Sequence, residues 1–177
     1  MKMCDEKTNS VKKIAVITSH PIQYQAPLFR AIARQPGMDL TVFFGSNHGI
    51  APDKVDPGFG KAIAWDISLL DGYKHIFLNN SRPGREVNDW RLDAPDLKSY
   101  FKSGRYDAVL VFGWDKVLFW QAIWWARMYG IPLIQRGESN LKHARPWHVR
   151  AAKKILFPLL FRQFKAFLSI GKLNAEL

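Results

Sequence analysis

The stretch KIAVITSHPIQYQAPLFRAIARQ, residues 13–35, opens as a buried β-strand and closes as an α-helix. Residues 14–18 are apolar and largely β-branched, which is typical of a strand. A helical pattern follows over residues 26–34 and is stopped by a Pro-Gly pair. Between the two elements, residues 19–25 place a histidine, two glutamines and a tyrosine in one short loop. Because that loop is too polar for a mere connection, we expect it to face a cleft.

The same alternation of strand and helix recurs along the chain. Further strands are predicted at residues 40–44, 107–112, 131–135 and 166–170, with a weaker one at 74–78, and further helices at 115–129 and about 146–164. Asp115 is the predicted N-cap of the first of these helices, and Pro158 is expected to kink the second. Residues 45–91 are irregular and are expected to form a long excursion of loops. Short apolar strands that alternate with helices predict a doubly wound, mostly parallel, Rossmann-like α/β fold.

The length of 177 residues suits one domain with a substantial core. Residues 1–12 are expected to form a disordered tail, and residues 13–177 a single domain. The only cysteine, Cys4, lies in that tail, which fits a reducing compartment. The first residues lack the apolar segment of a signal peptide, and no apolar run reaches the length of a membrane span. We therefore expect a cytoplasmic protein.

Positive charge is concentrated toward the end of the sequence. The formal net charge is +11, and residues 139–175 contain no acidic residue. The cations of this segment are Lys142, Arg145, Arg150, Lys153, Lys154, Arg162, Lys165 and Lys172. Such a segment suits an anionic partner, either the inner face of a membrane, on which the protein would be peripheral, or nucleic acid. A solvated helix face is the alternative, and the apolar residues between 155 and 164 fit either a bilayer-facing side or a core side.

Three tryptophans on the predicted helix at 115–129 bear on the choice of partner. Trp120, Trp124 and Trp125 fall at helical spacing, which favours burial in the core or in a domain interface over a stacking surface for bases. Nucleic acid is then supported by charge alone and is the least favoured partner.

Polar residues follow the predicted strands at the edge where their carboxyl ends meet, and this is where open parallel sheets bind ligands. The candidates are Ser19, His20, Gln23 and Tyr24 after the first strand, Trp114 and Asp115 after the strand at 107–112, and Arg136, Glu138 and Ser139 after the strand at 131–135. Structural alternatives are helix capping for His20 and Asp115, packing for Gln23, Tyr24 and Trp114, and a mutual ion pair for Arg136 and Glu138. His48, in the loop excursion, is expected to be solvated.

Several familiar chemistries lack their motifs in this sequence. No G-x-G-x-x-G follows the first strand, and neither a Walker loop nor a G-x-S-x-G is present. The histidines and the single cysteine do not fall at metal-ligand spacing. Neither a metal nor a bound cofactor is therefore predicted.

With these residues in view, the chain resembles the N-terminal half of a GT-B glycosyltransferase of the family 4 type. The most specific stretch is SHPIQYQAP, within the first strand, loop and helix KIAVITSHPIQYQAPLFRAIA. DLTVFFGSNHG and GFGKAIAWDISLLDGYKHIFLNN resemble the family's second strand and its long excursion. The later strand ends of the family are similar to RYDAVLVFGWDK, PLIQRGESNL and FKAFLSIGKLNAEL. The resemblance covers residues 13–177.

The resemblance implies one Rossmann-like half of a two-domain architecture. In this family the N-terminal domain holds the acceptor, and the C-terminal domain holds a nucleoside-diphosphate sugar as co-substrate. Residues 19–24 match the loop near the donor phosphates and the acceptor, and residues 136–139 match the acceptor pocket. A strand-end histidine common in the family is replaced here by the stretch 112–114. The donor-binding pair of glutamates, seven residues apart in the family, has no counterpart in the 177 residues. We therefore expect the C-terminal donor domain to lie outside these residues, either further along the same polypeptide or on another chain.

Residues and resemblance together predict the acceptor-binding half of a nucleotide-sugar-dependent glycosyltransferase that acts on a cell-envelope polysaccharide or glycolipid. Asp115 or Glu138 is the expected base for the acceptor hydroxyl. The expected donor and acceptor contacts are Ser19, His20, Gln23, Tyr24, Trp114, Arg136 and Ser139. The alternative is a non-catalytic module that binds a glycan or an anionic lipid.

Overall fold

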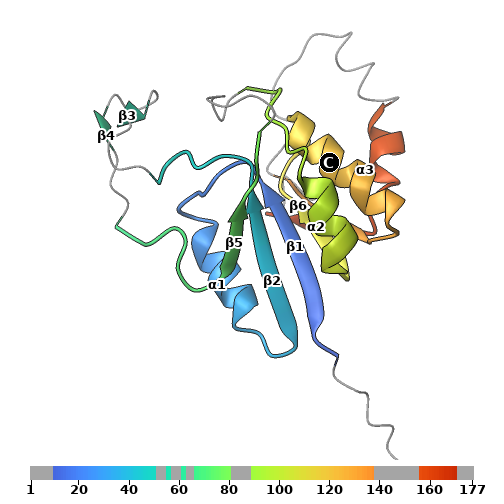
Figure 1. Cartoon of the computed structure of the whole chain (residues 1–177), viewed down its shortest axis with the longest axis horizontal. Coiled ribbons are helices and arrows are strands. Elements are labelled where there is room, and N and C mark those ends of the chain that lie inside the picture. Colours follow the sequence, from blue (N-terminus) through green and yellow to red (C-terminus); the bar gives the residue numbers. More distant parts are fainter. Residues whose placement is uncertain are drawn as a thin grey trace, which may run out of the picture.

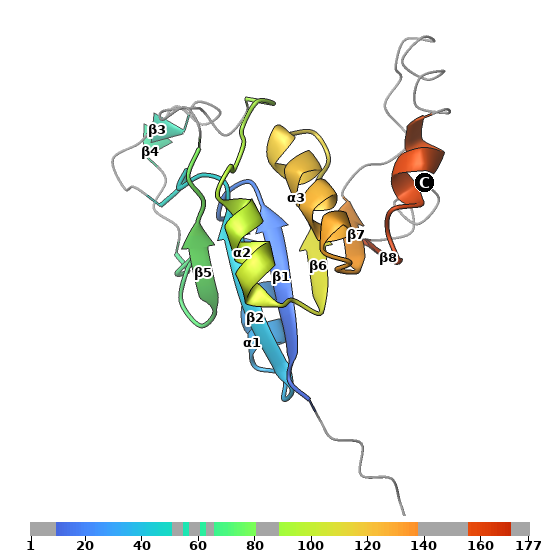
Figure 2. The same ribbon diagram turned by 45° about the vertical axis from the view of Figure 1, so that its right-hand side comes forward.

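A computed structural model of the chain describes residues 10–50, 55–56, 61–62, 66–80, 89–137 and 156–170. Six strands form one all-parallel sheet in the order β5-β2-β1-β6-β7-β8 (Figures 1 and 2). The strands are β1 (Lys12–Thr18), β2 (Met38–Phe44), β5 (Lys74–Phe77), β6 (Ala108–Val111), β7 (Leu133–Gly137) and β8 (Ala166–Ser169). The helices are α1 (Ala26–Ala33), α2 (Leu97–Gly104) and α3 (Val117–Met128), with residues 156–161 also helical. A separate antiparallel ribbon pairs β3 (Val55–Asp56) with β4 (Lys61–Ala62). The predicted doubly wound, Rossmann-like α/β fold is confirmed.

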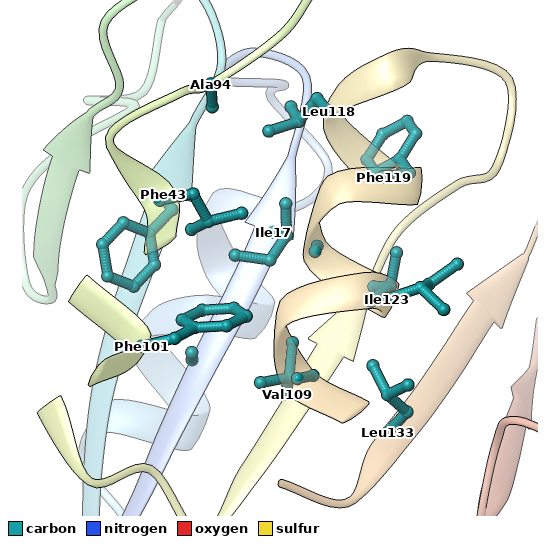
Figure 3. Close-up of a cluster of buried hydrophobic side chains, with 14 of the residues drawn as sticks. Ile17, Phe43, Ala94, Phe101, Val109, Leu118, Phe119, Ile123 and Leu133 are labelled. Carbon is teal, nitrogen blue, oxygen red and sulfur yellow. The ribbon is translucent and has the colours of Figure 1, made fainter. Parts of the chain in front are cut away.

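Helices cover both faces of the sheet. On one face, Phe29 of α1 joins Val16, Val42 and Leu110 in a buried cluster. The other face carries α2 and α3 (Figure 2). The cluster beneath these two helices includes Ile17, Phe43, Phe101, Val109, Leu118, Phe119, Ile123 and Leu133 (Figure 3). The chain therefore crosses from β1 to β2 over one face and from β6 to β7 over the opposite face.

β1 is a central strand and is buried on both faces. Ala15, Val16 and Ile17 are completely buried. Because successive side chains of a strand point to opposite faces, Ala15 and Ile17 join the cluster under α2 and α3, while Val16 joins the cluster under α1. Burial on both faces requires an unbroken apolar run, which is why residues 14–18 identify this strand in the sequence.

Some elements differ from those predicted. β1 begins at Lys12, so the sheet takes in the last residue of the predicted tail, of which residues 1–9 lie outside the described part of the chain. α2 is not among the predicted elements, because its eight residues hold only a short apolar pattern, with Leu97 and Phe101 buried. Of the helix predicted at about 146–164, residues 156–161 are helical, and Pro158 lies within this segment. The part before residue 156, which a kink at Pro158 would join to this segment, lies outside the described residues.

Candidate functional site

The carboxyl ends of β1 and β6 form the switch point of this sheet. The two strands are neighbours, and the amide of Phe112 donates a hydrogen bond to the carbonyl of Ile17 (3.0 Å). Beyond that point the chain turns from β1 into α1 on one face, and from β6 into α3 on the other. In doubly wound sheets the crevice opened by such diverging connections is where ligands bind. The residues that follow β1 and β6 are therefore the first to consider.

A serine and two histidines meet where β1 and β2 end. Ser19 Oγ lies 2.9 Å from His20 Nδ1, within hydrogen-bond distance. The imidazole ring of His20 packs edge-on against that of His48, with ring centroids 5.6 Å apart. His48 follows β2, and both histidines are half-buried. His48 was expected to be solvated and is instead paired with His20; because the contact spans 28 positions of sequence, no local pattern announces it.

Gln23 links the loop after β1 to the excursion after β2. Its Nε2 donates to Oδ1 of Asp66 (2.8 Å), and Tyr24 beside it is 55% exposed. Gln25, by contrast, is buried, and its Oε1 accepts a hydrogen bond from Thr18 Oγ1 (3.3 Å). Thr18 and Gln25 thus fasten the loop to the sheet, while Gln23 and Tyr24 lie toward solvent, as a contact with a ligand requires.

The segment that carries Asp66 is held on α1. Arg30 of α1 donates through Nε to the carbonyl of Asp71 (2.9 Å) and through its terminal nitrogen to the carbonyl of Ser68. The Tyr73 hydroxyl donates to the carbonyl of Leu69. Burial raises the pKa of Tyr73 to about 12, against the opposing charge of Arg30, so this phenol stays protonated at neutral pH. These bonds fix the base of the excursion and so support the Gln23–Asp66 contact.

Two glycines let the start of α3 approach the sheet edge closely. A Cβ at Gly45 would lie 2.6 Å from Cδ2 of Leu118, and a Cβ at Gly113 would lie 2.6 Å from Cε2 of Phe119. Both distances are far shorter than a carbon–carbon contact allows. The absence of a side chain at these two strand ends therefore lets the first turn of α3 pack against the edge of the sheet.

Asp115 and Lys116 form an ion pair at the entrance to α3. The Lys116 ammonium donates to Oδ2 of Asp115 (2.8 Å). The Asp115 side chain is 64% exposed, whereas that of Lys116 is only 10% exposed. The prediction that Asp115 caps α3 is wrong: the N-cap is Lys116, without a side-chain capping bond, because the Asp115 carboxylate pairs with the neighbouring cation. Lys116, a cation in a predominantly buried setting next to the crevice, was not predicted as a site residue.

Trp114 and Arg136 lie on opposite faces of the sheet. Trp114 packs against the cluster under α3, with its ring 5.0 Å from that of Phe157. The Arg136 guanidinium stacks 4.7 Å from the ring centroid of Phe112, which belongs to the cluster under α1. Trp114 and Arg136, both predicted to contact the ligand, are therefore not brought together on one side of the sheet. Glu138 and Ser139 lie outside the described residues, so the expected Arg136–Glu138 pair does too.

Of the predicted anion-binding cations, the structure describes two. Arg162 and Lys165 are both exposed. The remaining cations of that set, Lys142, Arg145, Arg150, Lys153, Lys154 and Lys172, lie outside the described residues. Within the described part of the chain, no helix has the length and apolar character needed to cross a bilayer, and no three metal-ligating side chains gather at one place.

Comparison with known proteins adds no family. No protein-family model matches the sequence, and no curated protein matches it either. The fold and the geometry of the sheet edge define the chain as a Rossmann-like α/β protein with a candidate site at its switch point.

Proposed function

We propose that this chain is the acceptor-binding half of a nucleotide-sugar-dependent glycosyltransferase acting on a cell-envelope polysaccharide or glycolipid. The observation that carries the proposal is the carboxyl edge of the sheet at its switch point, where Ser19, His20 and the Asp115–Lys116 pair follow adjacent strands. The residues that form this edge are also those on which the resemblance to GT-B glycosyltransferases rests. Hydroxyl, imidazole, amide and ammonium groups suit a ligand rich in hydroxyls and phosphates.

The reaction under this proposal transfers a sugar from a nucleoside diphosphate to an acceptor hydroxyl. The bond between the sugar's anomeric carbon and the phosphate oxygen breaks, a glycosidic bond forms, and the acceptor proton passes to a base. Asp115 is the described candidate for that base, with its carboxylate exposed and held by Lys116. His20 and Gln23 would orient the acceptor, and the Lys116 ammonium would balance phosphate charge. The donor is expected to be held by a second domain.

A genetic complementation assay tests this function. Cells that make the protein are deprived of its gene, and incorporation of labelled sugar into envelope glycolipid and polysaccharide is measured. We expect incorporation to fall, to be restored by the wild-type gene, and not to be restored by Gln23→Ala. The matched control is Gln35→Ala, an exposed glutamine beyond the end of α1, which should restore incorporation fully.

Two outcomes of this assay would overturn the proposal. Unchanged incorporation after deletion would exclude the transferase. Equal restoration by Gln23→Ala and Gln35→Ala would exclude this edge as the site. If the protein bound envelope glycans while deletion left incorporation unchanged, the non-catalytic binding module would replace the transferase.

A further inference from the structure

α3 is apolar around almost its whole circumference. Of its twelve residues, VLFWQAIWWARM, only Gln121 and Arg127 are polar. The Gln121 side chain is used internally, since its Oε1 accepts the amide of Ala94 (2.7 Å). The side toward the sheet buries Leu118, Phe119, Ala122, Ile123 and Ala126. A helix that is apolar all round is normally buried all round, so the opposite side of α3 needs an explanation.

That opposite side is exposed and carries large side chains. Trp120 is 48% exposed, Trp124 61% and Met128 61%. Their spacing of four residues aligns them in one stripe along the helix. Of the two predicted alternatives, burial in the core is wrong for Trp120 and Trp124, because the core side of α3 is occupied by other residues. Burial in a domain interface stays a prediction. Trp125 differs, since Lys98 lies 4.8 Å from its ring centroid and Tyr129 stacks on it.

A second helical segment also carries exposed apolar side chains. In residues 156–161, Leu160 belongs to the buried cluster that includes Phe119 and Ile123 of α3. On its outer side, Leu156 and Leu159 are 60% and 56% exposed. We call the set Trp120, Trp124, Met128, Leu156 and Leu159 the tryptophan face. A cluster of exposed large apolar residues of this kind marks an interaction surface.

Exposed cations lie on α3 and directly after the helical segment 156–161, while the carboxylate of Asp115 at the start of α3 is paired with Lys116. Arg127 on α3, Arg162 and Lys165 are all exposed. In the sequence from residue 116 to residue 175, Glu138 is the only acidic residue. An apolar surface bordered by cations complements a surface that is apolar beneath and anionic above. That description fits the interface of an anionic bilayer, where indole rings sit at headgroup level and arginines pair with phosphates.

We propose that the tryptophan face docks the protein on an anionic lipid bilayer. Trp120, Trp124 and Leu159 would enter the headgroup region, and Arg127 and Arg162 would bind lipid phosphates. The docking requires no sugar transfer, so it stands or falls separately from the proposed function. A bilayer bound there would lie along α3, whose first turn borders the crevice, and would bring a lipid-linked molecule close to that edge.

Vesicle sedimentation tests the docking. Binding is compared between vesicles of phosphatidylglycerol mixed with phosphatidylcholine and vesicles of phosphatidylcholine alone. We expect wild-type protein to bind the anionic vesicles, to lose affinity as salt rises, and to shift its tryptophan emission to shorter wavelength. The variant W120S/W124S should bind at least about tenfold more weakly. Its matched control, V11S/M38S, removes two exposed apolar residues where β1 and β2 begin and should bind like wild type.

The contribution of positive charge to binding is tested with a second pair of variants. Arg127→Glu on the tryptophan face should weaken binding to anionic vesicles, while Arg34→Glu at the end of α1, on the other face of the sheet, should change it much less. Thermal unfolding followed by circular dichroism checks that each variant is folded. Equal binding by W120S/W124S and V11S/M38S would overturn the proposal. So would equal binding to neutral vesicles, or self-association in solution that disappears in W120S/W124S, which would assign the face to a second copy of the chain.

Discussion

Gly113 shows how a single residue shapes the candidate site. Its missing side chain leaves room for the Phe119 ring, which is buried at the start of α3. The same turn carries Asp115 and Lys116, so the position of this ring sets the position of the ion pair. Gly45 plays the equivalent part toward Leu118. The candidate site at this edge therefore depends on the two glycines as well as on its polar side chains.

Replacing Gly113 by alanine should therefore destabilise the fold. The new methyl group would overlap an aromatic ring that is itself packed, and overpacking of this kind costs about 1–3 kcal/mol. Urea unfolding of Gly113→Ala measures the loss. Gly137→Ala is the matched control at another strand end, because its Cβ would meet Gln135 at an ordinary 3.7 Å. A stability equal to that of Gly137→Ala would contradict the packing described here.

Lys116 leads to a second prediction at this scale. A charge-assisted hydrogen bond to a phosphate contributes about 1.5–3 kcal/mol, so Lys116→Gln should lower sugar incorporation in the complementation assay by about tenfold. Lys102→Gln removes an exposed lysine of α2 and should leave incorporation unchanged. Full activity of Lys116→Gln would remove this cation from the site.

Among the elements, β1 and β6 are joined by an aspartate where β6 begins. Oδ2 of Asp107 accepts the amide of Lys13 (2.8 Å), and its own amide donates to the carbonyl of Lys13 (2.8 Å). Lys12 lies 3.4 Å from Oδ1 of the same carboxylate. The hydrogen bond donated by the backbone amide of Lys13, together with the charge of Lys12, lowers the pKa of Asp107 below its usual value. The ionised form of Asp107 is thus more stable in the folded chain than in the unfolded chain.

This junction makes stability depend on acid pH. Because the folded pKa is the lower one, the contribution of Asp107 is complete above the ordinary aspartate pKa of about 4 and is lost as pH falls through the folded value. We expect Asp107→Asn, whose amide oxygen can still accept from Lys13, to flatten the fall of unfolding free energy in this range. Urea unfolding at several acid pH values measures it, with Asp71→Asn as the exposed control. An unchanged slope in Asp107→Asn would contradict the assignment.

The sequence allowed an element to be predicted where its burial produced a recognisable pattern of apolar residues. β1, β2 and β6 are continuous apolar runs because both of their faces are covered, and each was located from composition alone. α2 is short and buries few residues, so its pattern did not stand out. The exposure of Trp124 could not be read either, because helical spacing shows that residues share a face but not whether another element covers it.

For the whole molecule, topology turned separate strand ends into one edge. The order of the sheet makes β1 and β6 neighbours, whereas the alternation of strands and helices in the sequence predicts only that the strands are parallel. The side-chain pairs at that edge were less accessible to prediction. His20 meets His48, and Gln23 meets Asp66, only because loops distant in sequence converge there. Trp114 and Arg136, both predicted at the edge, were separated by the alternation of faces.

Binding of a glycan at this edge can be detected residue by residue in a two-dimensional amide NMR titration. Isotope-labelled protein is titrated with oligosaccharide fragments of the cell envelope. We expect the amide signals of Ser19, His20, Gly113 and Asp115 to shift together, while those of Met38 and Arg105, at the amino edge of the sheet, stay in place. Shifts confined to the amino edge or to the tryptophan face, or no shift with any oligosaccharide, would contradict glycan binding at the carboxyl edge of the sheet.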